Sequence, residues 1–270
     1  MVKSKLAFSL VELSIVLVIL GLLTGGILAG QSLIRAAEFR AALSEHARYS
    51  AAIYTFRDKY FGIPGDIRNA TAFWGRQSTD ALCYNLTGAV GTNPNGACDA
   101  NGDGTLGFNQ AGRAGESQQF WRQLALAGLI EGTYSGLAGP NWPSECRIDI
   151  ECPRSRLPNA GWGASHIAKG FGGDAEWFGN IEYGNYMALG APHAAAYTIP
   201  MAPVLKPEEA WNFDVKVDDG RPTTGKLIAR YWNNACTAPD SGAASATNHN
   251  ASYRLSDQSI RCAIVFINTI

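Results

Sequence analysis

The segment Asp99-Ala100-Asn101-Gly102-Asp103-Gly104-Thr105 has the spacing of a cation-binding loop. Oxygen-bearing side chains stand at its first, third and fifth positions, and a glycine at the sixth permits a sharp turn, as in the front half of an EF-hand-type calcium loop. Position twelve is Gln110 instead of the bidentate Glu of an intact EF-hand, and Glu116 is the next carboxylate along the chain. The alternative is a polar turn without metal. The predicted calcium ligands are Asp99, Asn101, Asp103, the Thr105 carbonyl and Glu116.

The other ionisable side chains carry weaker signals. Asp214 and Asp218 stand one helical turn apart, with Asp219 beside them, and a solvated charged face is expected there instead of a metal site. The histidines are scattered without the spacing of metal ligands. One of them, His46, falls on the apolar side of a helical pattern, so we expect a packed or capping role for it.

Catalytic motifs are absent from the sequence. It contains no G-x-S-x-G elbow, no H-E-x-x-H helix and no phosphate-binding P-loop, so we predict that the protein is not an enzyme. The formal net charge is −1, which provides no basic field for nucleic acid, and no nucleic-acid partner is predicted.

One carboxylate lies in an almost purely apolar segment. The 27 residues from Phe8 to Ile34 contain a single charge, Glu12. A helix of this length spans the apolar core of a bilayer. A carboxylate near the start of such a segment is costly unless it finds a partner, so the presence of Glu12 indicates a functional role.

The elements that position these residues begin with one long helix. The segment from Arg35 to Tyr60 contains neither Pro nor Gly, and its apolar residues recur with helical spacing. Gly62-Ile63-Pro64-Gly65 then breaks the pattern. We predict a helix from about Ser9 to Tyr60, on the order of 75 Å long at ~1.5 Å per residue.

The rest of the chain predicts a loop-rich α+β head. The counts of 30 Gly and 12 Pro favour many turns. Residues 66–75 are expected to form a turn or short helical piece, and residues 132–180 mostly loop. Proline and acidic residues at Pro207-Glu208-Glu209 open a helix that ends near Asp218. Residues 116–126 form another helix, and residues 183–189, 195–199, 226–232 and 260–267 are expected strands of an antiparallel sheet.

The N-terminal segment resembles the leader of type IV prepilins and of type II secretion pseudopilins. Members carry a short basic leader, a small residue before the cut, Phe or Met after it, and Glu at the fifth mature position. The resemblance is close from Lys5 to about Leu23, and it departs at the residue before the cut, which is usually Gly. The corresponding residues here are Lys3, Lys5, Ala7, Phe8 and Glu12.

This resemblance implies processing and assembly. A prepilin peptidase cleaves between Ala7 and Phe8 and methylates the new amino terminus at Phe8, and Glu12 meets the amine of a neighbouring subunit. An ordinary secretory signal or signal anchor is the alternative, with Ala29-Gly30-Gln31 as a weak cleavage site. The implied organisation is a leader (1–7), a transmembrane or filament-core half-helix (8–34), an amphipathic half-helix (35–61) and a pilin-like head (62–270).

The resemblance also implies a role and a location. The chain is expected to be a structural subunit, minor or specialised, of a type IV pilus-like filament built with other pilin or pseudopilin subunits. It spans the bacterial inner membrane once, with its head in the periplasm, before it joins a filament at the cell surface or in the periplasm. The alternatives are a pseudopilin of a type II secretion system and a membrane-tethered adhesion module.

Six cysteines in a chain that crosses the inner membrane indicate disulfides outside the cytoplasm. Six cysteines allow 15 connectivities. Pairing of nearest neighbours is favoured because each pair closes a loop of plausible length. The last pair would enclose the stretch from Thr237 to Ser252, which is too polar for a core and is a candidate contact region. The expected pairs are Cys83–Cys98, Cys146–Cys152 and Cys236–Cys262.

Overall fold

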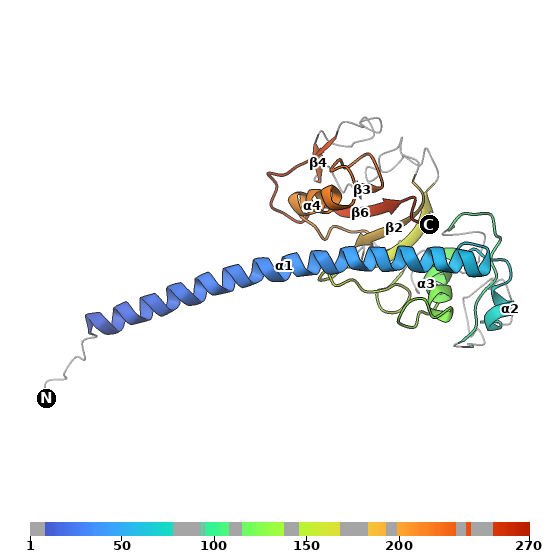
Figure 1. Ribbon diagram of the computed structural model, residues 1–270, viewed down its shortest axis with the longest axis horizontal. Coiled ribbons are helices and arrows are strands. Elements are labelled where there is room, and N and C mark those ends of the chain that lie inside the picture. Colours follow the sequence, from blue (N-terminus) through green and yellow to red (C-terminus); the bar gives the residue numbers. More distant parts are fainter. Residues whose placement is uncertain are drawn as a thin grey trace.

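The structure of the protein is a computed structural model. It describes residues 9–77, 93, 95–107, 115–137, 146–167, 183–192, 199–230, 236–238 and 251–270. A long N-terminal helix projects from a head, and the head packs only against the C-terminal half of that helix (Figure 1). The head combines short helices with an antiparallel sheet, so the expected α+β class is confirmed.

Helix α1 spans Leu10–Tyr60 and is one unbroken element of 51 residues. It ends because Phe61 adopts a left-handed conformation with φ 56°, while the Phe61 amide still donates to the Arg57 carbonyl. Gly62 and Pro64 follow shortly afterwards, and a proline soon after the cap cannot continue a helix. The predicted helix from about Ser9 to Tyr60 is therefore confirmed.

Four strands of the described chain form an antiparallel main sheet in the order β1-β2-β6-β3. Every residue of β6 is buried, and its sequence of β-branched and aromatic side chains favours a central strand. The expected strands at 183–189, 226–232 and 260–267 overlap β2, β3 and β6 and are confirmed. The bounds are β1 Gly161–Ile167, β2 Gly184–Gly190, β3 Leu227–Arg230 and β6 Ala263–Ile267.

Strand β1 lies within residues 132–180, where mostly loop was predicted and no strand was expected; the other described residues of this range are loop and turn. The sequence did not predict this strand because it contains Gly161 and Gly163, and glycine is a poor strand former. Here glycine is required: a Cβ on Gly163 would collide with the side chain of Ile199, and a Cβ on Gly161 with that of Ile148. The expected strand at 195–199 lies outside the described residues except at Ile199.

Three shorter helices and a small sheet complete the described part of the head. In α4, Pro207 occupies the first turn, and Glu209 accepts a hydrogen bond from the Lys206 amide at 2.9 Å. The expected helices at 116–126 and from Pro207, and the expected short piece within 66–75, are confirmed. The bounds are α2 Ala70–Trp74, α3 Glu116–Leu126, α4 Pro207–Val217, β4 Thr237–Ala238 and β5 Ser252–Tyr253.

The core of the head lies between the second half of α1, helix α3 and the main sheet. Tyr49 of α1 packs edge-on against Trp121 of α3 and Trp162 of β1, with ring centroids 5.1 and 5.7 Å apart. His46 stacks on Phe266 of β6 at a centroid distance of 3.9 Å. Burial lowers the pKa of His46 to about 4, so the ring is neutral at pH 7. His46 is thus a packed residue, as expected.

Candidate functional site

The N-terminal segment is described from Ser9 onward, and Ala7 and Phe8, where cleavage and methylation are expected, lie outside the described residues. Glu12 Oε2 accepts a hydrogen bond from the Ser9 amide at 2.9 Å, and Ser9 Oγ accepts one from the Val11 amide at 3.3 Å. This reciprocal arrangement is a capping box, which satisfies amides at the start of a helix. The pattern Ser-x-x-Glu in the sequence is its signal, and the prediction for Glu12 did not include this role.

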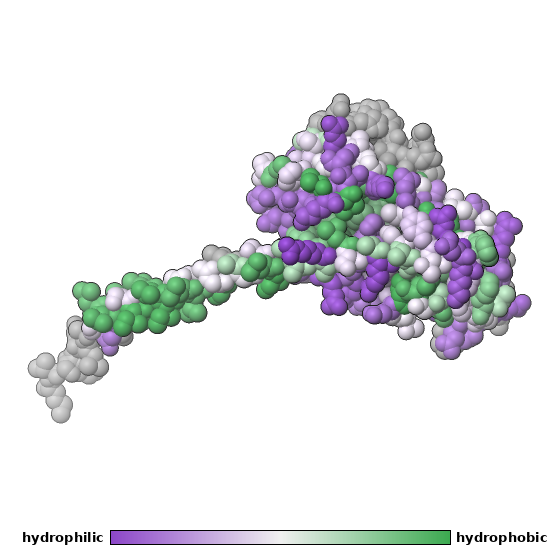
Figure 2. All heavy atoms as spheres, viewed as in Figure 1, coloured by the Kyte–Doolittle hydropathy of each residue, from purple (hydrophilic) through white to green (hydrophobic). Residues whose placement is uncertain are grey.

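The first half of α1 extends away from the head (Figure 1). Its apolar side chains are exposed on all sides, and Figure 2 shows them as a continuous apolar shaft that leads away from a mostly polar head. Among the described residues, α1 is the one helix whose length and apolar composition suffice to cross a membrane. This finding agrees with a single membrane span at the N-terminus.

A buried carboxylate joins the second half of α1 to the head. Glu45 Oε2 accepts hydrogen bonds from the Ser155 hydroxyl at 2.7 Å and from the Trp162 indole N–H at 2.9 Å. Glu45 Oε1 accepts one from the Arg156 amide at 2.9 Å. Sequence reasoning did not single out Glu45, because nothing in the helical pattern shows which glutamate the head will cover.

A second link lies nearer the apolar half of α1. Arg35 of α1 forms two hydrogen bonds with Glu209 of α4, from Nε at 2.8 Å and from Nη2 at 2.9 Å. Such bidentate pairs between arginine and carboxylate fix orientation as well as distance. The two links, Glu45 and Arg35, therefore hold α1 at a defined angle to the head.

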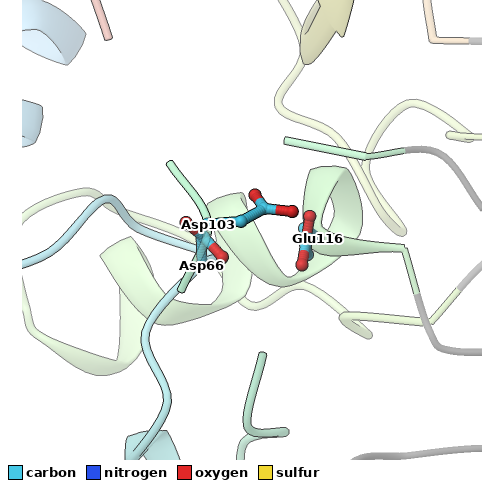
Figure 3. A group of neighbouring side chains, drawn as sticks. All are labelled: Asp66, Asp103 and Glu116. Carbon is cyan, nitrogen blue, oxygen red and sulfur yellow. The ribbon is translucent and has the colours of Figure 1, made fainter. Parts of the chain in front are cut away.

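Three carboxylates from distant parts of the sequence meet at the far end of α1. Asp66, Asp103 and Glu116 each offer an oxygen, and these oxygens all lie within 4.8 Å of one another. Figure 3 shows the Asp103 carboxylate extending toward Glu116, with Asp66 beside Asp103. Asp66 follows α1, Asp103 belongs to the loop at 99–107, and Glu116 begins α3.

Asp66 reaches the loop because the chain turns sharply after α1. Gly65 has φ +86° and lies against the backbone of α3, where its amide donates to Gln123 Oε1 at 2.7 Å. The two oxygens of Asp66 then accept hydrogen bonds from the Gly102 and Gly104 amides, both at 2.7 Å. Sequence reasoning missed Asp66 because only the folded chain brings it to the loop.

Two other expected calcium ligands, Asn101 and Thr105, contact the acidic group because both form hydrogen bonds with Asp103. Asn101 Nδ2 donates to Asp103 Oδ2 at 2.7 Å. The Thr105 amide and hydroxyl donate to Asp103 Oδ1 at 2.8 and 2.7 Å. These hydrogen bonds hold the Asp103 carboxylate in place beside Glu116 and Asp66.

Asp99, the expected first ligand, points elsewhere. Its two carboxylate oxygens accept hydrogen bonds from the Thr71 amide at 2.8 Å and the Thr71 hydroxyl at 2.9 Å, at the start of α2. Asp99 therefore satisfies an amide in the first turn of that helix, where helical partners are missing. The structure thus places Asp66 in the acidic group in place of Asp99.

Burial disfavours the charged forms of the carboxylates in this acidic group. It raises the pKa of Glu116 to about 7; the Gly107 amide opposes this shift, and the charges of Asp66 and Asp103 add to it. Burial also raises the pKa of Asp66, against the opposing effect of the Gly104 and Gly102 amides. Glu116 Oε2 accepts the Gly107 amide at 2.8 Å, whereas Glu116 Oε1 has no hydrogen-bond partner among the described residues.

The second acidic group has a different character. Asp214 is fully buried, so the expectation of a solvated face is wrong for this residue. Its oxygens accept hydrogen bonds from the Tyr253 hydroxyl at 2.7 Å and the Gly220 amide at 3.1 Å. Burial raises the pKa of Asp214 to about 7. Both of its oxygens have protein partners, in contrast to Glu116.

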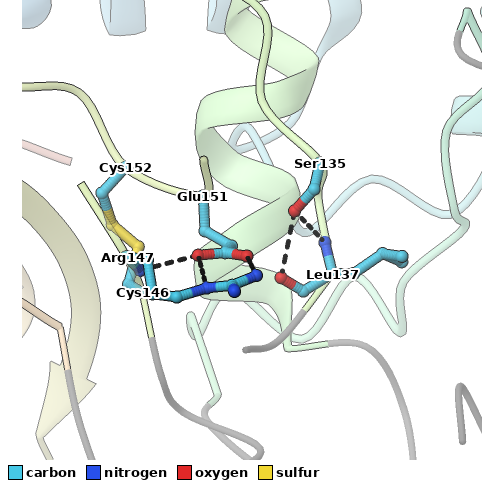
Figure 4. Close-up of a disulfide and its surroundings, with 6 residues drawn as sticks. All are labelled: Ser135, Leu137, Cys146, Arg147, Glu151 and Cys152. Carbon is cyan, nitrogen blue, oxygen red and sulfur yellow. Dashed lines mark hydrogen bonds and ion pairs between the residues drawn. A yellow bond between two sulfur atoms is a disulfide. The ribbon is translucent and has the colours of Figure 1, made fainter. Parts of the chain in front are cut away.

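Two of the three cysteine pairs predicted from the sequence form disulfides in the structure. Cys146 and Cys152 lie with Cα atoms 5.6 Å apart, and the short segment between them is held by an ion pair of Arg147 with buried Glu151 (Figure 4). Cys236 and Cys262, with Cα atoms 5.1 Å apart, tie the start of β4 to β6.

The third expected pair, Cys83–Cys98, lies outside the described residues on the side of Cys83. The stretch from Thr237 to Ser252, expected to be too polar for the core, contains a fully buried Thr237. Thr237 is buried because the neighbouring Cys236 forms a disulfide with Cys262 and because Thr237 itself pairs with Tyr253 of β5. Residues 239–250 lie outside the described part.

A comparison of the chain with protein-family models found no match, and searches among curated proteins and solved structures found none either. The residues and contacts described above are therefore the basis on which a role is assigned.

Proposed function

We propose that the chain is a structural subunit of a type IV pilus-like filament, of the minor or specialised kind. The first half of α1 anchors it in the inner membrane of a bacterium, with the head in the periplasm, until a prepilin peptidase removes residues 1–7 and methylates Phe8. Helix α1 then enters the core of the filament, and the heads form its outer wall. The fold supports this role because it pairs a long apolar helix with an α+β head that contains an antiparallel sheet.

The observation that carries the proposal is the contrast between the two halves of α1. Fourteen Leu, Ile and Val side chains between Leu10 and Ile34 are exposed in the isolated chain. Burial of each contributes about 1.5–3 kcal/mol, so covering this half is worth on the order of 20 kcal/mol or more. Lipid provides such a cover before assembly, and the apolar helices of neighbouring subunits provide it afterwards. Because α1 is unbroken, the subunit can exchange one cover for the other without refolding.

Glycines in the same half are suited to close helix packing. Gly21, Gly25, Gly26 and Gly30 have nothing of the described chain within 4 Å of the position where a Cβ would stand. The fold of the head therefore does not require glycine at these positions. Small residues on apolar helices allow neighbouring backbones to approach closely.

Glu12 is placed to serve assembly as well as capping. Its carboxylate already binds the Ser9 amide, one residue after the amino terminus that cleavage would create. In a bundle of apolar helices, a cationic amine and a carboxylate relieve each other's desolvation when they pair. We therefore assign Glu12 to the amine of Phe8 of a neighbouring subunit.

Substitutions at Glu12 separate the assembly role from the capping role. Glu12→Gln keeps an oxygen that can close the capping box but removes the charge, whereas Ser9→Ala breaks half of the box and keeps the charge. We expect Glu12→Ala and Glu12→Gln to insert into the membrane normally and to be reduced at least tenfold in filament incorporation. Ser9→Ala should be incorporated nearly as well as wild type. Normal incorporation of Glu12→Gln, measured by immunoblotting of sheared filaments and membranes, would exclude charge pairing.

Deletion of the gene distinguishes the two kinds of filament. Loss or shortening of surface fibres in electron micrographs supports a pilus subunit. Loss of a secreted enzyme with fibres intact would instead assign the chain to a type II secretion pseudopilus. Persistence of both, together with lost binding to surfaces, would favour the membrane-tethered adhesion module.

A further inference from the structure

We propose that Asp66, Asp103 and Glu116 bind a divalent cation, Ca²⁺, which ties together the end of α1, the loop at 99–107 and the start of α3. This inference does not depend on the filament role. It concerns a site formed entirely within the head.

The decisive observation is the state of Glu116. Its side chain is buried, with only 4% of the residue exposed, and Oε1 has no hydrogen-bond partner among the described residues. A buried polar oxygen without a partner is costly, and natural proteins rarely leave one in that state. Oε1 belongs to a carboxylate that lies beside those of Asp103 and Asp66, with an oxygen from each of the three within 4.8 Å of the others (Figure 3). A cation between these groups would supply the missing partner.

The spacing of the carboxylates suits calcium. Ca²⁺ binds oxygens at about 2.3–2.6 Å, so two ligands of one ion are separated by no more than about 5 Å. The offered oxygens of Asp66, Asp103 and Glu116 all lie within 4.8 Å of one another. Calcium also accepts backbone carbonyls and irregular geometry, which a loop rich in glycine can provide. Magnesium requires a near-ideal octahedron at about 2.0–2.1 Å and is the poorer match.

The surrounding contacts give the site a rigid frame. Asn185 of β2 donates from Nδ2 to the Gly104 carbonyl at 2.8 Å and accepts the Leu106 amide at 2.9 Å. Arg68 Nε donates to the Asn101 carbonyl at 2.6 Å, which fixes the other side of the loop. A preorganised loop loses less conformational freedom when an ion binds. A structural site with a Kd of about 10⁻⁴–10⁻³ M would fill outside the cytoplasm.

The test is thermal unfolding of the full chain in mild detergent, followed by tryptophan fluorescence, with 10 mM CaCl₂ or with chelator. Because ligand that binds only the folded state stabilises it, calcium should raise the melting temperature of the wild type by several degrees, and MgCl₂ should raise it less. Glu116→Gln is nearly isosteric and removes one of three like charges. It should melt no lower than wild type in chelator and should lose the calcium-dependent increase.

Matched controls distinguish this site from two others. Asp99→Asn changes a residue of the sequence motif that lies outside the acidic group, and Asp214→Asn changes the second acidic group; both should keep the calcium-dependent increase. Asp66→Asn should lose it. The absence of any increase in the wild type would overturn the proposal. So would an increase that survives in Glu116→Gln, or one that depends on Asp99 and not on Asp66.

Discussion

Asp214 shows how one buried carboxylic acid makes stability depend on pH. Its pKa is about 7 in the folded head, compared with 3.8 for an ordinary aspartate, so the folded state keeps a proton that the unfolded state loses. Its contribution to stability is complete below about pH 4 and falls as pH rises toward 7, by at most ~1.4 kcal/mol per pH unit. Above that range the loss is complete and constant.

Asp214→Asn should remove this dependence while leaving an acceptor for the Tyr253 hydroxyl. Relative to wild type, the variant should gain free energy of unfolding as pH rises from 4 to 7. Urea titrations at a series of pH values measure that difference, in which the shifted groups His46 and Glu116 cancel because both proteins contain them. A difference that does not change with pH would show that Asp214 is ionised in the folded head.

Residue types and spacing predicted part of the acidic site and not the rest. The motif at 99–105 correctly located a loop of polar turns beside Glu116. It did not reveal Asp66, because this residue arrives only through the turn at Gly65 after α1. Nor did it show that the Asp99 carboxylate binds the Thr71 amide at the start of α2, because a short acidic side chain is equally able to cap a helix. Spacing within a loop predicts local convergence, whereas contributions from distant segments require the fold.

Among the elements, α1 could be read most fully from the sequence, because its pattern is long and its end is marked by Gly62 and Pro64. Strand β1, in contrast, could not be predicted from the sequence. Its glycines are dictated by the close approach of Ile148 and Ile199, which is a tertiary constraint. The head-facing side of α1 was visible as an apolar stripe, but the polar link at Glu45 was hidden among other charges.

Glu45 should be the most sensitive charged residue of α1. Glu45→Ala leaves the Ser155 hydroxyl, the Arg156 amide and the Trp162 indole without their acceptor, which should lower the free energy of unfolding by about 3 kcal/mol or more. Glu38→Ala is the matched control, because it removes only a pair with Arg35 one turn away and should cost less than ~1 kcal/mol. Equal effects of the two variants in urea titration would show that Glu45 does not secure the head.

At the scale of the whole molecule, polarity is divided between shaft and head (Figure 2). The head buries a core of its own, whereas the apolar side chains of the shaft are exposed. The link between Arg35 and Glu209 lies where these two regions meet, so the head is fixed at the point where the helix would leave the bilayer. This division is what a subunit needs if it is to leave a membrane and join a bundle of equivalent helices.

The most direct test of this account is the intact mass of the chain purified from a bacterium that contains a prepilin peptidase. The account predicts a protein that lacks residues 1–7, begins at Phe8 and carries one additional methyl group on its amino terminus. Fragmentation of the N-terminal peptide locates that methyl group. A chain that retains Met1 to Ala7, or one cut after Ala29 as an ordinary secretory signal would be, would contradict the assignment as a filament subunit.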